Sequence, residues 1–315
     1  MESGGEQMPD PRISIVQKVL TITDFKRLRS QPFHYPDVAV LKNIRRKKSE
    51  NKTKELPFDL YLPKSIKGPL PLIIDIHGGG LVYGNKELNR WSAAETARRG
   101  YAVVLLDYPL IPTATLPEQV QAILNGMGAL DLLHRIPFDK DRVFLRGDSA
   151  GGLLSVLTLA VLNDPSIHQQ FKITHDYKIQ GTALIHPMVE TKRNDILGFI
   201  PDFIPDFHPL ENHLTQEQNL STISQEKTPR YFFEPLLGTS ILPPTWLVTS
   251  QNDFMFNLES KALAKDLKRN EIHHELNDFP MTMKVPLNHI FMITHPNLKQ
   301  SQRMYDSMAE FFQKL

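Results

Sequence analysis

The sequence predicts an α/β fold with a mostly parallel central sheet, and three observations support this prediction. Apolar runs of strand length alternate with helical patterns through most of the 315 residues. The strand-like run at residues 70–76 ends at a glycine cluster, and the run at 143–148 breaks at a glycine before an apolar helix begins. The hydrophobic fraction of 41% and the charged fraction of 23% are ordinary for a globular protein.

The individual elements follow from the periodicity of the apolar residues. One helical segment, residues 116–136, places its apolar side chains on a single face. An antiparallel pair at residues 37–44 and 56–63 is expected to lead into the sheet. The remaining strands are expected within residues 70–80, 101–110, 143–148, 181–188, 244–253 and 273–279, and the remaining helices within residues 87–100, 150–160, 257–270 and 301–315.

Composition excludes several classes of partner. A formal net charge of +1 gives no reason to expect nucleic acid or an anionic membrane. The basic run at residues 44–54 is interpreted as a solvated hairpin tip, with an anion-binding patch as the alternative. The absence of cysteine rules out disulfides and thiolate metal sites. We see neither a signal peptide nor a run of roughly 18 apolar residues, so a cytoplasmic protein without an integral membrane segment is expected.

Two segments do not fit the sheet pattern. Residues 11–32 are amphipathic and are predicted to be helical. Residues 190–240 are rich in proline, phenylalanine and polar residues, without strand alternation. A long insertion between two strands favours a lid, although a plain surface loop is the alternative.

The segment Gly147-Asp148-Ser149-Ala150-Gly151 forms a Gly-x-Ser-x-Gly pattern between a predicted strand and a predicted helix. A serine at such a corner takes a strained backbone conformation, and glycines on either side prevent clashes of neighbouring Cβ atoms. The hydroxyl is thereby raised above the carboxyl edge of the sheet, where the start of the helix points its free amides. The pattern predicts that Ser149 is a nucleophile.

A second glycine-rich loop, His77-Gly-Gly-Gly-Leu-Val-Tyr-Gly84, follows the predicted strand at residues 70–76. Amides presented by such a loop can donate hydrogen bonds to the oxyanion of an acyl-transfer intermediate. A nucleotide-phosphate loop is the competing interpretation, but neither of its glycine signatures is present. This loop therefore favours nucleophilic catalysis.

The motifs HGGGLVYG, DYPLIPTATLPEQV and GDSAGG, in this order, resemble the hormone-sensitive-lipase-type esterases of the α/β-hydrolase fold. The resemblance extends from about residue 37 to the C-terminus. It implies a single α/β-hydrolase domain over residues 1–315, with a helical cap from about residues 1–37 and 190–240. It further implies a Ser–Asp–His triad, hydrolysis of carboxylic esters without a cofactor or metal, and oxyanion donors at Gly79, Gly80 and Ala150. Relatives of this type often form homodimers.

The acid of the triad should follow the serine and precede the histidine. Asp253 lies just past a predicted strand end, where the family carries its carboxylate. The family usually has a second acid four residues later, but this chain has Asn257 there, which weakens the expected support of the loop. The competing carboxylates Asp266 and Asp278 fall within helix and strand patterns and are interpreted as surface charges.

The predicted base is His289, which lies in a loop before the closing helix and matches the His-x-Phe context of the family. His273 and His274 begin a predicted strand, and His295 lacks the family context. The loop before His289 is longer than the family norm, which is a departure from the family pattern.

These residues predict a hydrolase of small or medium acyl esters that forms an acyl-enzyme. His77 and Asp148 are interpreted as structural supports of the glycine loop and the serine corner. An amidase or formamidase, a deacetylase and a lipase would use the same residues and remain open. A non-catalytic receptor with the same fold is the alternative from another class, but it would be expected to have a broken triad.

Overall fold

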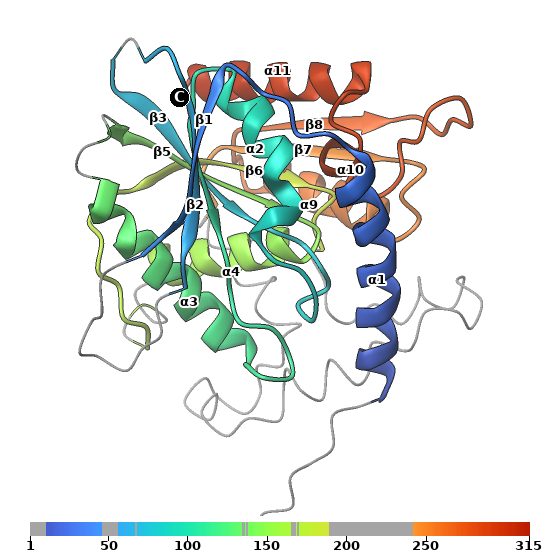
Figure 1. Ribbon diagram of the computed structural model, residues 1–315, viewed down its shortest axis with the longest axis horizontal. Helices are drawn as coiled ribbons and strands as arrows, with labels where there is room; N and C mark the ends of the chain where they lie inside the picture. Colours follow the sequence, from blue (N-terminus) through green and yellow to red (C-terminus); the bar gives the residue numbers. More distant parts are fainter. Residues whose placement is uncertain are drawn as a thin grey trace, which may run out of the picture.

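The computed structural model of the chain describes residues 11–45, 56–66, 68–133, 136, 138–164, 168, 170–188 and 242–315. Within this part, eight strands form one sheet in the order β1-β2-β4-β3-β5-β6-β7-β8 (Figure 1). β1 pairs antiparallel with β2, and β2 with β4, while the other pairings are parallel. The predicted α/β class and the leading antiparallel pair are confirmed. The strands are β1 Val38–Ile44, β2 Phe58–Pro63, β3 Leu70–Ile76, β4 Ala102–Leu106, β5 Phe138–Asp148, β6 Ile179–Ile185, β7 Thr245–Ser250 and β8 His274–Phe279.

Helices cover both faces of the sheet. α3 Leu116–Gly128, α4 Ala150–Asn163 and α9 Asn257–Arg269 share one apolar core with one face. α2 Arg90–Ala97, α10 Phe291–Thr294 and α11 Lys299–Gln313 share a second core with the other face. Strands β3, β4 and β7 are buried along their whole length, as expected for parallel strands with helices on both sides. No helix in the described ranges is both long and apolar enough to cross a membrane.

The start of α3 shows how local sequence sets an element boundary. The Thr115 hydroxyl accepts a hydrogen bond from the Glu118 amide, and the Glu118 carboxylate accepts one from the Thr115 amide, which forms a capping box. The helix ends at Gly128, earlier than the segment 116–136 predicted, and the 3₁₀-helix η2 Ala129–Leu133 follows it. A Cβ atom on Gly128 would lie 1.9 Å from Thr174 Oγ1, so a larger residue there would displace the Thr174 side chain.

Helix α1, Pro11–Ser30, lies beside the sheet rather than in its layers, near α10 (Figure 1). Gln17 Nε2 donates a hydrogen bond to the carbonyl of Val82, within the glycine loop, at 2.9 Å. Beyond the end of α1, Gln31 Nε2 donates to the carbonyl of Thr294 at 2.7 Å. The helix predicted within residues 11–32 therefore contacts the carboxyl edge of the sheet. The second part of the predicted cap, residues 190–240, lies outside the described residues, as does most of the basic run at 44–54.

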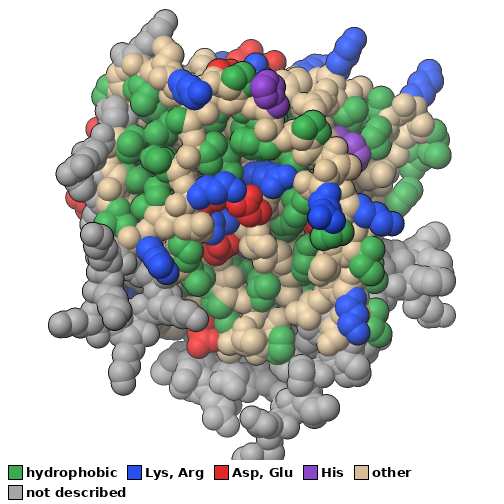
Figure 2. Space-filling model, in the orientation of Figure 1, with side chains coloured by type: hydrophobic (Ala, Val, Ile, Leu, Met, Phe, Trp, Pro, Cys, Tyr) green, Lys and Arg blue, Asp and Glu red, His purple; other side chains and the backbone are tan. Residues whose placement is uncertain are grey.

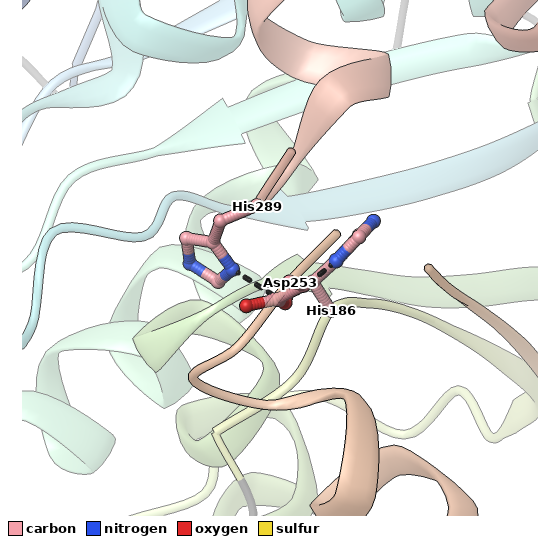
Figure 3. Close-up of side chains that lie close together, drawn as sticks. All are labelled: His186, Asp253 and His289. Atoms are coloured by element: carbon pink, nitrogen blue, oxygen red, sulfur yellow. Dashed lines mark hydrogen bonds and ion pairs between the residues drawn. The ribbon is translucent and has the colours of Figure 1, made fainter. Parts of the chain in front are cut away.

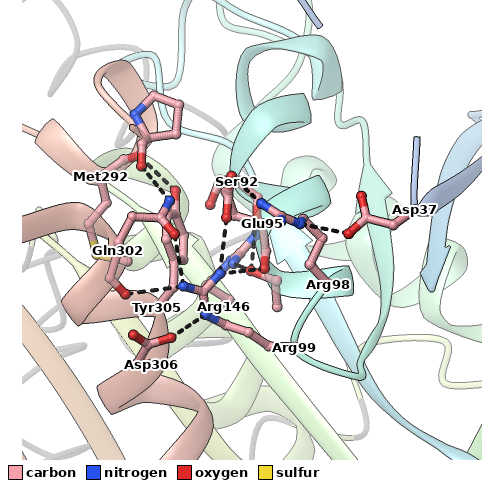
Figure 4. Close-up of polar contacts among 12 residues, drawn as sticks. Asp37, Ser92, Glu95, Arg98, Arg99, Arg146, Met292, Gln302, Tyr305 and Asp306 are labelled. Carbon is pink, nitrogen blue, oxygen red and sulfur yellow. Dashed lines mark hydrogen bonds and ion pairs between the residues drawn. The ribbon is translucent and has the colours of Figure 1, made fainter. Parts of the chain in front are cut away.

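Polar contacts join Arg99, just after α2, to α11, and join α11 to α10, on one face of the sheet (Figure 4). Arg99 Nε donates to Asp306 Oδ1 at 2.7 Å, and Arg99 Nη2 donates to Gln302 Oε1 at 3.0 Å. The Tyr305 hydroxyl donates to the carbonyl of Met292 at 2.7 Å. The closing helix is thus fixed to the short helix α10.

A buried ion pair joins the two central strands. The guanidinium of Arg146 in β5 pairs with the carboxylate of Asp75 in β3, and both side chains are almost fully buried. Arg146 Nη1 also donates to Thr96 Oγ1 of α2 at 2.6 Å, and Asn89 Nδ2 donates to Asp75 Oδ1 at 2.6 Å. A buried charge requires such partners, because burial without them costs several kcal/mol.

We expect Asp75→Asn to lower the free energy of unfolding by about 3–5 kcal/mol, because it leaves the Arg146 guanidinium unpaired in the interior. Asp37→Asn is the matched control, since it removes the pair with Arg98 at 2.8 Å, where both side chains are about half exposed. That change should cost about 1 kcal/mol or less. Urea unfolding measures both, and equal losses would contradict the importance of the buried pair.

Candidate active site

Ser149 lies at the corner between β5 and α4. Its backbone angles, φ 52° and ψ −122°, fall in a region that residues other than glycine rarely adopt. Two hydrogen bonds hold it there: the Ser149 amide donates to the carbonyl of Ile185 at 3.0 Å, and the Met188 amide donates to the carbonyl of Ser149 at 3.0 Å. The end of β6 and the segment that follows it thus fix the strained corner.

The two glycines of the corner are required by close backbone approach. A Cβ atom on Gly147 would lie 2.2 Å from the carbonyl oxygen of Gly151. A Cβ atom on Gly151 would lie 2.0 Å from the carbonyl oxygen of Ile76, at the end of β3. The serine corner therefore packs directly against the strand that leads into the glycine loop.

The structure brings the three predicted catalytic side chains together. Ser149 Oγ is 2.9 Å from His289 Nε2, and His289 Nδ1 is 2.9 Å from Asp253 Oδ2 (Figure 3 shows the histidine and the acid). An ionised carboxylate only accepts hydrogen bonds, so His289 Nδ1 carries the proton and donates it to Asp253. The unprotonated Nε2 then faces the Ser149 hydroxyl and can accept its proton.

The loop that carries His289 is anchored to the end of β7. Asn252 Nδ2 donates to the carbonyl of Thr282 at 2.8 Å, and the Thr282 amide donates to Asn252 Oδ1 at 2.9 Å. The Ser250 hydroxyl donates to the carbonyl of Leu287. These contacts place His289 beside Asp253 in spite of the length of the loop.

The Asp253 carboxylate receives hydrogen bonds at both oxygens. Oδ1 accepts from the amides of Met255 at 3.1 Å and Phe256 at 3.2 Å. Oδ2 accepts from His289 and from a second histidine, His186, whose Nδ1 lies 2.7 Å away. Burial by itself raises the pKa of Asp253, but the hydrogen bonds from His186 and His289 outweigh it and hold the pKa well below its usual range. Asp253 is therefore ionised at neutral pH.

His186 is the site residue that the sequence analysis missed. It follows β6 directly and is fully buried, and burial lowers the pKa of its imidazole, so the ring is neutral. The available signal was a histidine at the carboxyl end of the predicted strand within residues 181–188. That signal becomes informative only when β6 is known to lie between β5, which precedes Ser149, and β7, which precedes Asp253.

The glycine loop lies against the serine corner. A Cβ atom on Gly78 would be 2.5 Å from Asp148 Oδ2 and 3.1 Å from Ser149 Cβ. Gly79 and Gly80 have φ values of +119° and +62°, which favour glycine. We find no hydrogen bond from the amides of these two glycines to any other described residue. Together with the amide of Ala150, the first residue of α4, they are the predicted oxyanion donors.

Two aromatic rings support the glycine loop. The His77 ring stacks on Tyr108 with 4.3 Å between the ring centres. His77 Nδ1 donates to the carbonyl of Gly78 at 2.7 Å, and the Tyr108 hydroxyl donates to the carbonyl of His77 at 2.8 Å. Burial lowers the pKa of His77, which keeps the ring neutral beside the loop. These contacts agree with a structural role for His77.

The side chain of Asp148 connects the serine corner to the glycine loop. Its Oδ1 accepts hydrogen bonds from the amide of Gly78 at 3.2 Å and from Asn89 Nδ2 at 2.7 Å. Burial, and next the charge of Asp75, raise the pKa of Asp148 to about 6. The carboxyl group thus binds the backbone of the loop rather than the reacting atoms.

The competing residues have other partners. Asp266 pairs with Arg269 at 3.1 Å, and Asp278 pairs with Lys261 at 2.8 Å. Asn257, at the position of the usual second acid, donates its Nδ2 hydrogen to Asp278 Oδ1 at 2.9 Å. It thereby ties the start of α9 to β8.

Among the described residues, one group has side chains that could converge on a metal ion: His186, Asp253 and His289, whose ligand atoms lie within 4.8 Å of one another. In the structure, both histidines already donate their Nδ1 hydrogen to the Asp253 carboxylate. Hydrogen bonding therefore accounts for the cluster.

Comparison with known proteins agrees with the fold. Residues 73–285 match the family described as alpha/beta hydrolase fold, and the chain belongs to this family. It is similar to the probable carboxylesterase 6 of Arabidopsis thaliana, with 34% identity over 140 residues, which cover 41% of this chain and 40% of that protein. It is also similar to the arylacetamide deacetylase of Rattus norvegicus, with 31% identity over 143 residues, which cover 43% of this chain and 34% of the relative.

The chain thus spans less than half the length of these curated relatives. Among solved structures, esterase B from Lactobacillus rhamnosis superposes with a TM-score of 0.83 and 26% identity. That match covers 96% of this chain and 95% of the esterase. The family resemblance predicted from the sequence motifs is confirmed.

We expect Gly151→Ala to destabilise the protein by more than about 3 kcal/mol, because the new methyl group would lie 2.0 Å from a backbone oxygen that cannot easily move. Gly68→Ala is the control, since no atom lies within 4 Å of a Cβ atom there, and its effect should stay within about 0.5 kcal/mol. Thermal and urea unfolding compare the two variants. Similar stability of both would show that the corner is not tightly packed.

Asp148 should make stability depend on pH. Its pKa in the folded protein, about 6, lies above the ordinary value of 3.8, so the folded state binds the proton more tightly than the unfolded state. This contribution to stability is complete below about pH 4 and is lost as the pH rises through about 6. Asp148→Asn should remove this pH-dependent loss of stability. In urea unfolding, the free energy of unfolding of the wild type should therefore fall relative to that of the variant between pH 4 and 7. Parallel stability curves would contradict the raised pKa.

Proposed function

We propose that this chain is a carboxylic-ester hydrolase that acts on small to medium acyl esters through Ser149, His289 and Asp253. The observation that carries this proposal is the continuous line of hydrogen bonds from Ser149 Oγ through the imidazole to the acid, 2.9 Å at each step. The line begins at Ser149, whose corner lies against the glycine loop. Backbone amides of this loop could donate hydrogen bonds to the carbonyl oxygen of an ester.

The reaction follows from this geometry. His289 Nε2 takes the hydroxyl proton as Ser149 Oγ bonds to the carbonyl carbon of the ester. The carbonyl oxygen becomes an oxyanion, and the amides of Gly79, Gly80 and Ala150 donate hydrogen bonds to it. Asp253 stabilises the imidazolium, which then gives its proton to the leaving alcohol as the C–O bond breaks. Water repeats both steps on the acyl-enzyme and releases the carboxylic acid.

The relatives support this reaction and the size of the acyl group. Esterase B from Lactobacillus rhamnosis was also solved with a C4-C4 SN3 tributyrin phosphonate inhibitor. Its likeness over nearly the whole chain favours short acyl groups for this protein as well. The similarity to a probable carboxylesterase points to the same class of reaction.

A deacetylase or amidase is the second candidate, because an arylacetamide deacetylase is among the relatives. The same side chains would serve, with His289 protonating a leaving amine in place of an alcohol. A non-catalytic receptor is less favoured. Such a protein is expected to have a broken triad, whereas Ser149 and His289 are hydrogen-bonded to each other in this chain. The cap, the homodimer and the cytoplasmic location remain predictions.

We expect purified protein to hydrolyse p-nitrophenyl esters with a maximum between acetate and octanoate, and Ser149→Ala to lower kcat by at least about 10³-fold. A fluorophosphonate should label the wild type and the control Ser65→Ala, which changes an exposed serine after β2, but not Ser149→Ala. Faster turnover of p-nitroacetanilide than of the acetate ester would favour the deacetylase. Labelling that persists in Ser149→Ala would contradict the assigned nucleophile.

A further inference from the structure

His186 lies at a junction between the nucleophile and the acid. Its neighbour Ile185 accepts a hydrogen bond from the Ser149 amide, and Met188, two residues further on, donates to the Ser149 carbonyl. The backbone of His186 has φ 46°, and its amide donates to the carbonyl of Val248 in β7 at 2.9 Å. The backbone of this segment therefore fixes the direction of the His186 side chain relative to both neighbouring strands.

The side chain of His186 is directed at the catalytic acid. His186 and His289 approach the Asp253 carboxylate from two different segments of the chain (Figure 3). Both Nδ1 atoms contact the same oxygen, Oδ2, at 2.7 Å and 2.9 Å. The two imidazole rings are perpendicular, with 5.7 Å between their centres. The His186 ring also packs perpendicular to the ring of Phe291, with 5.5 Å between their centres. His186 is thus held by packing as well as by its hydrogen bond.

Only one protonation state of His186 fits these contacts. Its Nδ1 must carry a proton in order to donate to Asp253. Its Nε2 is buried and has no hydrogen-bond partner among the described residues, so protonation there would bury an unpaired N–H group. His186 is therefore a fixed, neutral donor and has no path by which to exchange a proton with Ser149.

We propose that His186 is a positioning residue, which holds the Asp253 carboxylate in place and takes up part of its negative charge. When a carboxylate oxygen accepts hydrogen bonds from two N–H groups, its negative charge stabilises each of them less than it would stabilise one alone. Asp253 therefore stabilises the imidazolium of His289 less strongly, and His289 gives its proton more readily to the leaving alcohol. The inference rests on the proposed function, because it describes how the triad of that reaction is tuned.

Other ionisable groups also act on the two histidines. The Asp148 carboxyl, next to Ser149 in the chain, interacts electrostatically with His289. The Asp278 carboxylate in β8 interacts with His186, and its charge is partly compensated by Lys261. Neither makes a hydrogen bond to a triad side chain among the described residues, whereas His186 contacts the acid directly.

The test uses two substitutions of His186 and one control. His186→Phe fills the same buried space but removes the donor, whereas His186→Asn keeps an N–H group near the position of Nδ1. His273→Asn is the control, since this exposed histidine stacks on Phe311 and lies outside the site. Thermal unfolding of each variant establishes that it is folded before kinetics are compared.

We expect His186→Phe to lower kcat for p-nitrophenyl acetate by about 10- to 100-fold with little change in KM. The acid limb of its pH profile of kcat/KM should move to higher pH by up to about one unit, because the whole carboxylate charge then acts on His289. His186→Asn should recover most of the rate and restore the position of the acid limb. A rate and profile of His186→Phe equal to those of His273→Asn, or no recovery in His186→Asn, would overturn the proposal.

A second measurement does not depend on activity. Far-downfield proton NMR signals are expected in the wild type from both imidazole N–H groups that donate to Asp253, and the one from His186 should disappear in His186→Phe. The buried Nδ1–H of His77, which is bound to the Gly78 carbonyl, is present in both proteins. A wild type in which no such signal can be assigned to His186 Nδ1 would overturn the proposal even if His186→Phe does not fold. If the wild type shows both signals but hydrolyses no ester, the proposed function fails and the contact between His186 and Asp253 stands.

Discussion

The left-handed backbone of Ser149 is the constraint on which the site depends. It is maintained because three contacts hold the corner: β3 packs against Gly151, Ile185 at the end of β6 binds the serine amide, and Met188 after β6 binds the serine carbonyl. Strain of this kind costs on the order of 1–3 kcal/mol and persists only where the surroundings determine it fully. The parallel strand order supplies these surroundings, since β5 lies between β3 and β6.

Two buried carboxyl groups flank the serine, and their environments give them different roles. Asp253 receives hydrogen bonds from two amides and two imidazoles, so it stays ionised and can stabilise a cation beside it. Asp148 is fully buried and lies near the negative charge of Asp75, and burial first and this charge second disfavour its ionisation. The group with the weaker tendency to ionise is the one nearest the glycine loop, where a second negative charge would oppose an oxyanion.

The sequence was sufficient for the fold class and for the pairing of β1 with β2, because strand periodicity and family motifs carry that information. Ser149 could be predicted from its local pattern, since glycine, serine and glycine must lie on a strand-to-helix corner. Asp253 and His289 were predicted from chain order and family context. His186 could not be found in this way, because a histidine at a strand end acquires meaning only from the neighbouring strands. The end of α3 was also missed, because the apolar spacing of the helix continues through the buried Leu130 and Leu133 of η2.

The attachment of the N-terminal segment to α10 affects the order in which the molecule can be assembled. The carbonyl groups of Ile293 and Thr294, which accept hydrogen bonds from Arg27 and Gln31, lie more than 260 residues further along the chain. A ribosome therefore makes α1 well before these acceptors. During synthesis, the end of α1 lacks its final partners until these further residues have been added, and the segment that carries His289 is secured from this side only then.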